Sequence, residues 1–143
     1  MYKRQGGYAG LNYRAARAQV AGETILGAEG RQGRDAVHGQ RTAWASYTGQ
    51  VDGAEDDEPD EPATGGVALL QHPGDAGHPS PFYVFSAVDD FGFLATAPLM
   101  LEERALAAGE VLRLRTRALV LGGSAAAEDL ERAAAGYAGA PGS

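Results

Sequence analysis

The segment Glu110–Leu121, with the sequence EVLRLRTRALVL, alternates apolar and polar side chains over most of its length. Successive side chains of a β-strand point to opposite faces, so this period of two predicts a strand. Alternation this regular is typical of a strand with one buried face and one face in water. The side chains predicted to be buried are Leu112, Leu114, Thr116, Ala118 and Val120, and those predicted to be exposed are Arg113, Arg115 and Arg117.

A helix is predicted directly after this strand. Two glycines end the strand, and Ser124 has the side chain of an N-cap for a helix over Ala125–Tyr137. The first turn of that helix is acidic, which suits the positive end of the helix dipole. We therefore assign residues 124–137 to a C-terminal helix and residues 138–143 to a disordered tail.

Four earlier runs have the composition or the alternation of strands. They are Gly6–Arg14, Thr42–Thr48, Gly66–His72 and Phe82–Val88. Ala15–Ala21 is predicted as a second short strand or a bulge, and Gly22–Gly39 as a loop with one possible strand at Glu23–Leu26. The acidic segment Asp52–Gly65 lacks the ligand spacing of a calcium loop and is predicted to be a solvated hairpin loop.

These elements predict an all-β fold, an antiparallel β-sandwich over residues 6–123 with one short C-terminal helix. Met1–Gln5 is predicted to be a non-native leader, because it resembles a translated sequencing adapter and Lys3 is the sole lysine of the chain. Without it, the chain begins inside a strand at Gly6. We therefore expect a fragment of a larger supersandwich that lacks the N-terminal half of the same protein, with sheet edges that promote aggregation.

Composition excludes several classes of function. The chain has 143 residues and a net charge of −7, whereas nucleic-acid binding requires clustered positive charge. No run approaches the roughly 18 apolar residues that cross a bilayer, so we expect a soluble protein, with the choice between cytoplasm and periplasm left open. The absence of cysteine excludes disulfides, thiolate metal sites and cysteine nucleophiles.

Two histidines occur in repeated His-Pro dipeptides. His72 and His78 each precede a proline, and Asp75 lies between them. Imidazole can bind a metal or transfer protons near neutral pH. A metal site requires three or four converging ligands, which a glycine-rich loop is poorly suited to hold. Three interpretations stay open for this loop: metal ligands, the rim of a substrate cleft, or turn residues.

Arginine and tryptophan supply the other candidates. Arg14 and Arg17 can hold a carboxylate or a pair of sugar hydroxyls through the planar guanidinium, or they form surface ion pairs of little energetic value. Trp44, the sole tryptophan, is either a platform for stacking on sugars or a core residue, and the pattern favours the core. No nucleophile elbow, phosphate loop or dinucleotide fingerprint is present, so no cofactor is predicted.

Four segments together resemble the soluble bacterial family catalogued as methane oxygenase PmoA-like. They are Gly6–Ala18, Gly33–Gly49, His72–Val84 and Leu106–Gly123. The resemblance implies the C-terminal half of a large β-sandwich protein, similar in style to galactose mutarotase and associated with carbohydrate catabolism. The positions it carries over to a cleft are Arg14, Arg17, His38, Trp44, His72 and His78, with His72, His38 and Arg14 as catalytic candidates.

Three hypotheses follow for the function. The first is a fragment of a carbohydrate-active or carbohydrate-binding β-sandwich protein. The second is a non-enzymatic module for protein contacts, which predicts that Arg14, His72 and Trp44 do not converge in space. The third is the oxidoreductase implied by the family label, which is disfavoured because true particulate methane monooxygenase subunits are embedded in membranes and this chain has no membrane span.

Overall fold

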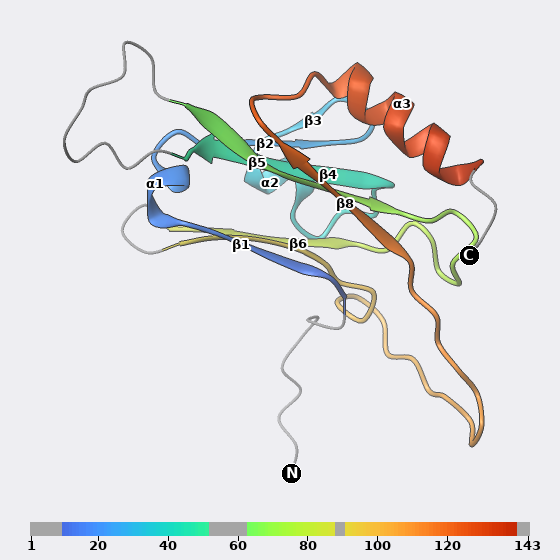
Figure 1. The fold of residues 1–143 in the computed structure, drawn as a ribbon. Helices are drawn as coiled ribbons and strands as arrows, with labels where there is room; N and C mark the ends of the chain where they lie inside the picture. Colours follow the sequence, from blue (N-terminus) through green and yellow to red (C-terminus); the bar gives the residue numbers. More distant parts are fainter. Residues whose placement is uncertain (1–9, 52–62, 88–90, 140–143) are drawn as a thin grey trace.

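The computed structural model describes residues 10–51, 63–87 and 91–139. Two antiparallel sheets lie face to face, and one helix covers the outer face of the larger sheet (Figure 1). The predicted leader, residues 1–5, most of the acidic segment and the last four residues of the predicted tail lie outside the described residues. The described part confirms the predicted fold class, a mostly β protein with the architecture of a β-sandwich.

The smaller sheet has three strands in the order β1-β7-β6, and the larger has five in the order β3-β2-β4-β5-β8. The strands are β1 (Asn12–Ala15), β2 (Thr24–Gly27), β3 (Arg31–Gln32), β4 (Trp44–Gln50), β5 (Thr64–Gln71), β6 (Phe82–Ser86), β7 (Gly92–Thr96) and β8 (Thr116–Leu121). The helices are α1 (Arg17–Val20), α2 (Arg34–Val37) and α3 (Ala127–Ala138). No helix in these ranges has the length and apolar character needed to cross a membrane.

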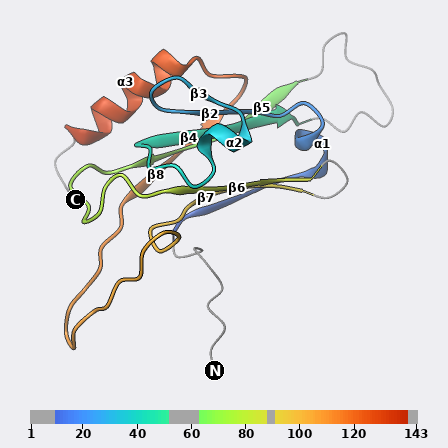
Figure 2. The same cartoon turned by 180° about the vertical axis from the view of Figure 1, so that it is seen from behind.

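Two separate hydrophobic clusters lie on the two faces of the larger sheet. Between the sheets, Tyr47 and Leu69 pack against Phe82 and Leu94 of the smaller sheet. On the opposite face, Trp44 and Leu70 pack beneath Leu130 of α3. The molecule therefore has three layers, and the view from behind shows the larger sheet between the smaller sheet and α3 (Figure 2).

The C-terminal helix differs in detail from its prediction. It begins at Ala127, and its N-cap residue is Ala126, so Ser124 does not cap it. Leu130 of the predicted apolar stripe is buried, as an amphipathic helix on a sheet requires. The segment Ala15–Ala21, predicted as strand or bulge, contains the short helix α1.

In the segment Glu110–Leu121, which has the clearest alternation of the sequence, only the second half forms a strand. Pairing in β8 begins at Thr116, and the chain from 101 to 111 is exposed. The predicted burial of Ala118 and Val120 is wrong, because both residues are exposed, Val120 to 87%. Leu119 and Leu121, on the other face of β8, pack instead against the cluster beneath α3. Alternation located the strand correctly, but which face is covered depends on the neighbouring layers.

In the larger sheet, the central strand β4 and its neighbour β5 approach each other closely at Gly66. A Cβ atom on Gly66 of β5 would lie 2.0 Å from the carbonyl oxygen of Tyr47 on β4. Gly122, just after β8, has no atom within 4 Å of the same position. These two glycines provide a matched pair for testing the constraint.

We expect Gly66→Ala to lower the free energy of unfolding by at least about 1–3 kcal/mol, because the backbone of β4 must move to accept the methyl group. Gly122→Ala should change it by less than about 0.5 kcal/mol. Urea denaturation followed by circular dichroism measures both. Equal stability of the two variants would contradict the described spacing of β4 and β5.

Candidate functional site

The outer face of the smaller sheet gathers aromatic side chains around one arginine. Phe82, Val84 and Leu94 point into the core, so their neighbours along β6 and β7 point outward. These neighbours line a hollow of about 410 Å³ together with a residue from β1. We call this set the aromatic face, and it consists of Arg14, Tyr83, Phe85, Phe91 and Phe93.

The rings of the aromatic face form a row of two contacting pairs, which the register of Phe85 opposite Phe93 places next to each other. The centroids of Tyr83 and Phe93 lie 5.9 Å apart, and those of Phe85 and Phe91 lie 5.3 Å apart. The guanidinium carbon of Arg14 lies 4.1 Å from the centroid of the Phe91 ring, within the range of a cation–π contact. The face therefore combines apolar rings with one positive charge that lies over one of them.

His38 borders this face at the edge of β6. Its ring lies 5.1 Å from that of Tyr83 in an edge-on arrangement. Its Nδ1 atom lies 2.9 Å from the carbonyl oxygen and 3.1 Å from the amide nitrogen of Val84. The tautomer decides which of these two backbone groups forms the hydrogen bond. Of the predicted site residues, Arg14 and His38 thus lie beside the same row of rings.

His72 occupies a different part of the molecule, at the end of β5. Its ring packs edge-on against Tyr137 of α3, with centroids 5.1 Å apart. Its Nδ1 accepts a hydrogen bond from the backbone N–H of Gly74 at 3.0 Å. Asp75 of the same loop has a side chain only 9% exposed and forms an ion pair with Arg115 at 2.7 Å. This loop is thereby attached to α3 and to the chain entering β8.

The imidazole of His78 lies in the same loop and is partly buried. Its Nε2 atom is buried without a hydrogen-bond partner among the described residues. Burial lowers the pKa of His78, the charge of Asp75 opposes this shift, and the charge of His72 adds to it. In the described ranges, no group of three or more histidine, aspartate or glutamate side chains could hold a metal ion.

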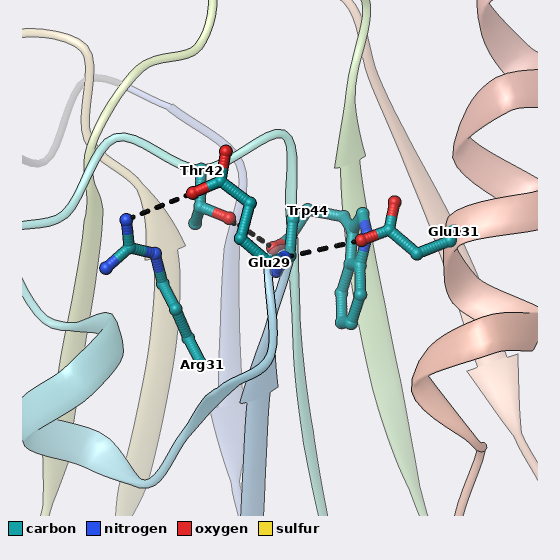
Figure 3. A network of polar contacts seen from close by, with 6 residues as sticks. Glu29, Arg31, Thr42, Trp44 and Glu131 are labelled. Carbon is teal, nitrogen blue, oxygen red and sulfur yellow. Dashed lines mark hydrogen bonds and ion pairs between the residues drawn. The ribbon is translucent and has the colours of Figure 1, made fainter.

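Trp44 is completely buried, with 0% of its surface exposed, between β4 and α3. Figure 3 shows it beside the polar contacts that attach the β2–β3 turn to the sheet and to α3. Thr42 donates a hydrogen bond to the carbonyl oxygen of Trp44 at 3.2 Å, and the N–H of Glu29 donates to Glu131 at 3.4 Å. The indole offers no face to a ligand, so Trp44 is the core residue that the sequence pattern favoured.

The predicted site residues therefore do not form one cleft. Arg14 lies on the outer face of the smaller sheet, Trp44 lies beneath α3, and His72 lies at the end of β5. Arg17 begins α1 and does not line the hollow of the aromatic face. This dispersal is the arrangement expected from the hypothesis of a non-enzymatic module.

The four rings of the aromatic face were missed as site residues by sequence reasoning. The strand at Phe82 was recognised, but aromatic residues occur on both of its faces, so the period of two did not identify an outer face. Phe91 and Phe93 flank Gly92 and were assigned to no strand. The register of β6 with β7, which pairs Phe85 with Phe93, brings these rings together and cannot be derived from the local pattern of either strand.

A second polar cluster, also missed, links the two sheets. The hydroxyl of Tyr47 on β4 donates a hydrogen bond to the carboxylate of Glu23, and Ser86 on β6 donates to the same oxygen at 2.7 Å. Burial, followed by the bond to Glu23, raises the pKa of Tyr47 well above its ordinary range. A Cβ atom on Gly92 would lie 2.1 Å from the Tyr47 hydroxyl oxygen, so a glycine is needed at this crossing.

Comparison with known proteins gives one family. A model described as a family of unknown function, DUF6807, matches residues 2–135. Neither the search of the curated proteins nor that of the solved structures gives a match. The resemblance to methane oxygenase PmoA-like proteins is therefore wrong as an assignment, since nothing links the matching family to them. The oxidoreductase hypothesis rested on that label alone and is withdrawn with it.

The link between Tyr47 and Glu23 can be tested by a double-mutant cycle. Glu23→Ala should lower the free energy of unfolding by about 1–3 kcal/mol, because two hydroxyls lose their acceptor. Tyr47→Phe should cost about 1 kcal/mol when Glu23 is present and close to nothing when it is absent. Chemical denaturation of the four proteins measures the coupling, and additive costs would contradict a direct bond.

The lowered pKa of His78 predicts a loss of stability on acidification. In the unfolded chain histidine titrates near pH 6.5, so below about that pH the unfolded chain binds more protons than the folded one. The midpoint of urea denaturation should therefore fall between about pH 7.5 and 5.5, and His78→Asn should fall less. The two proteins should have parallel midpoints between about pH 7.5 and 8.5, where histidine is neutral. An unchanged acid slope in His78→Asn would contradict the burial of a neutral imidazole.

Proposed function

Because the chain belongs to DUF6807, a family of unknown function, we propose its function from the site alone: the aromatic face binds carbohydrate. The observation that carries the proposal is the row of four rings around Arg14 that lines the hollow of about 410 Å³. Ligand sites are typically mostly apolar hollows of about 300–1,000 Å³ with a few polar groups that fix orientation. This hollow has that size and that composition.

The chemistry of a sugar ring fits both components of the face. One side of a pyranose ring presents C–H groups, which pack against aromatic rings, and its rim carries hydroxyls. Phe91 and Phe93 offer apolar surface, and the Tyr83 hydroxyl belongs to a side chain with an apolar body and a polar tip. The planar fork of Arg14 can donate to two adjacent oxygens of a hydroxyl pair or a carboxylate. The proposal is one of binding, since stacking and hydrogen bonding are what these side chains supply.

A protein-contact module is the second candidate function. It is favoured by the separation of Arg14, His72 and Trp44 into different parts of the molecule. Exposed apolar patches also occur at interfaces between proteins, and aromatic residues with arginine are enriched there. The two candidates differ in what saturates the aromatic face: a small sugar in the first and a folded surface in the second.

Calorimetric titration with neutral and uronate-containing oligosaccharides tests the first candidate. We expect Phe91→Ala and Arg14→Ala each to weaken binding about tenfold, equivalent to about 1.4 kcal/mol, since each removes one of the two contacts described above. Arg132→Ala on α3 removes an exposed arginine remote from the face and should bind like the wild type. A flat response to every sugar, or equal loss in all three variants, would sink the proposal.

A further inference from the structure

Among the strands of the described residues, β8 has no neighbour on one side, so it leaves one edge of the larger sheet open. It is the last strand in the sheet order and pairs with β5 on one side, from Gly66 opposite Leu121 to Gln71 opposite Thr116. With six residues it is longer than the other strands that end a sheet: β1, β3 and β6. An open edge exposes a row of backbone donors and acceptors that can pair with another chain.

The face of β8 that continues the sandwich core is apolar and uncovered. Ala118 and Val120 lie on the same side of the strand as Leu69 and Val67, their partners on β5. Leu69 is buried in the core between the sheets, whereas Val120 is 87% exposed. The smaller sheet therefore covers β5, and no described residue covers this face of β8 at Val120.

The opposite face of β8 carries one positive charge, Arg117, beside Leu119 and Leu121, which pack beneath α3. Arg117 lies over Tyr137 of α3, with its guanidinium carbon 4.2 Å from the ring centroid, and is exposed. Arg113 is exposed just before the strand. Within the described ranges neither forms an ion pair, although the whole chain has a net charge of −7. Arg115 differs, because Asp75 already holds it.

We propose that the open edge of β8 binds an extended segment of a partner protein that alternates carboxylate and branched apolar side chains. A strand added beside β8 must point alternate side chains to the two faces of the sheet. Apolar side chains would then extend the core over Ala118 and Val120, and carboxylates would lie opposite Arg117. Opposite charges that face each other across neighbouring strands stabilise the pair. Strand addition at a sheet edge is a general mode of peptide recognition.

Pairing with the proposed partner strand would also involve residues 112–115, which precede β8. The alternation of apolar and basic residues begins before Thr116, in a segment that the structure leaves outside any strand. Pairing with β5 continues one step further, since the carbonyl oxygen of Arg115 accepts the N–H of His72 at 3.0 Å. A partner strand would let residues 112–115 join the sheet, with Leu112 and Leu114 on the apolar face. Arg113 would then reach a further carboxylate.

Two blocked hexapeptides, Glu-Val-Glu-Val-Glu-Val and Lys-Val-Lys-Val-Lys-Val, test the proposal with the full chain. Titration by NMR should show binding of the glutamate peptide, slowed amide exchange along β8, and at least tenfold weaker binding of the lysine peptide. Affinity for the glutamate peptide should fall as salt is added. Equal binding of both peptides, or no protection of β8, overturns the proposal.

Two pairs of variants test the contributions of the apolar face and of the positive charge to peptide binding separately. Val120→Asp should weaken the glutamate peptide at least tenfold, whereas Ala135→Asp, an equal change on the exposed side of α3, should not. Arg117→Glu should reverse the preference toward the lysine peptide, and Arg132→Glu should leave it unchanged. Val120 and Arg117 are both exposed, so these changes leave the core intact, which circular dichroism verifies.

Two further results distinguish this surface from the alternatives. Phe91→Ala should bind the glutamate peptide like the wild type, because the aromatic face lies on the other sheet, so the sugar proposal and this one fail independently. Sedimentation equilibrium should show a monomer without peptide. A dimer that Val120→Asp dissociates would mean that a second copy of this chain occupies the edge, and the proposed partner would be wrong.

Discussion

The burial of β4 on both faces is the constraint on which the rest of the structure depends. Six of its seven residues are buried, which requires a layer above and a layer below. Tyr47 points toward the smaller sheet and Trp44 toward α3, so one strand anchors both hydrophobic clusters. A strand with large side chains on both faces cannot lie at the surface, and its neighbours β2 and β5 close its two edges. The glycine at position 66 then allows β4 and β5 to approach without a methyl group between them.

The sequence predicts the strands of this body well where their local pattern is sufficient. The runs beginning at Thr42, Gly66 and Phe82 correspond to β4, β5 and β6 within a few residues. The sequence does not predict which strand faces are buried, because burial depends on how many strands the second sheet has and not on the strand itself. Val120 has the alternation of a buried residue but extends beyond the three strands that could cover it. In the glycine-rich stretch after residue 22, the possible strand predicted at Glu23–Leu26 corresponds to β2, whereas β3, which among the described residues pairs with β2 alone, lies in what was predicted as loop.

Of the aromatic face, the sequence singled out the arginine but not the rings beside it. Arg14 was identified from its place on the polar face of a strand, and it does lie on an outer face. The rings beside it come from two strands and one loop residue, brought together by the register of β6 with β7 and of β7 with β1. No local pattern encodes such a register when both faces of a strand carry aromatic residues. For the histidines the reverse holds, because their His-Pro dipeptides are conspicuous in the sequence but do not lie on the aromatic face. His72 packs against Tyr137, and the Nε2 atom of His78 is buried.

The aromatic face and the open edge of β8 suit different ligands, because their polar groups are arranged differently. On the aromatic face one guanidinium lies over a ring in a hollow, so polar recognition is concentrated at one point and the remainder is apolar contact. Along β8 the backbone itself is open; one face carries Ala118 and Val120, and the other carries Arg117 beside the two leucines that pack beneath α3. A compact ligand can satisfy the first arrangement but cannot pair with a row of backbone groups. An extended chain satisfies the second because its own backbone has the same repeat. Since the two surfaces lie on different sheets, occupation of one leaves the other accessible.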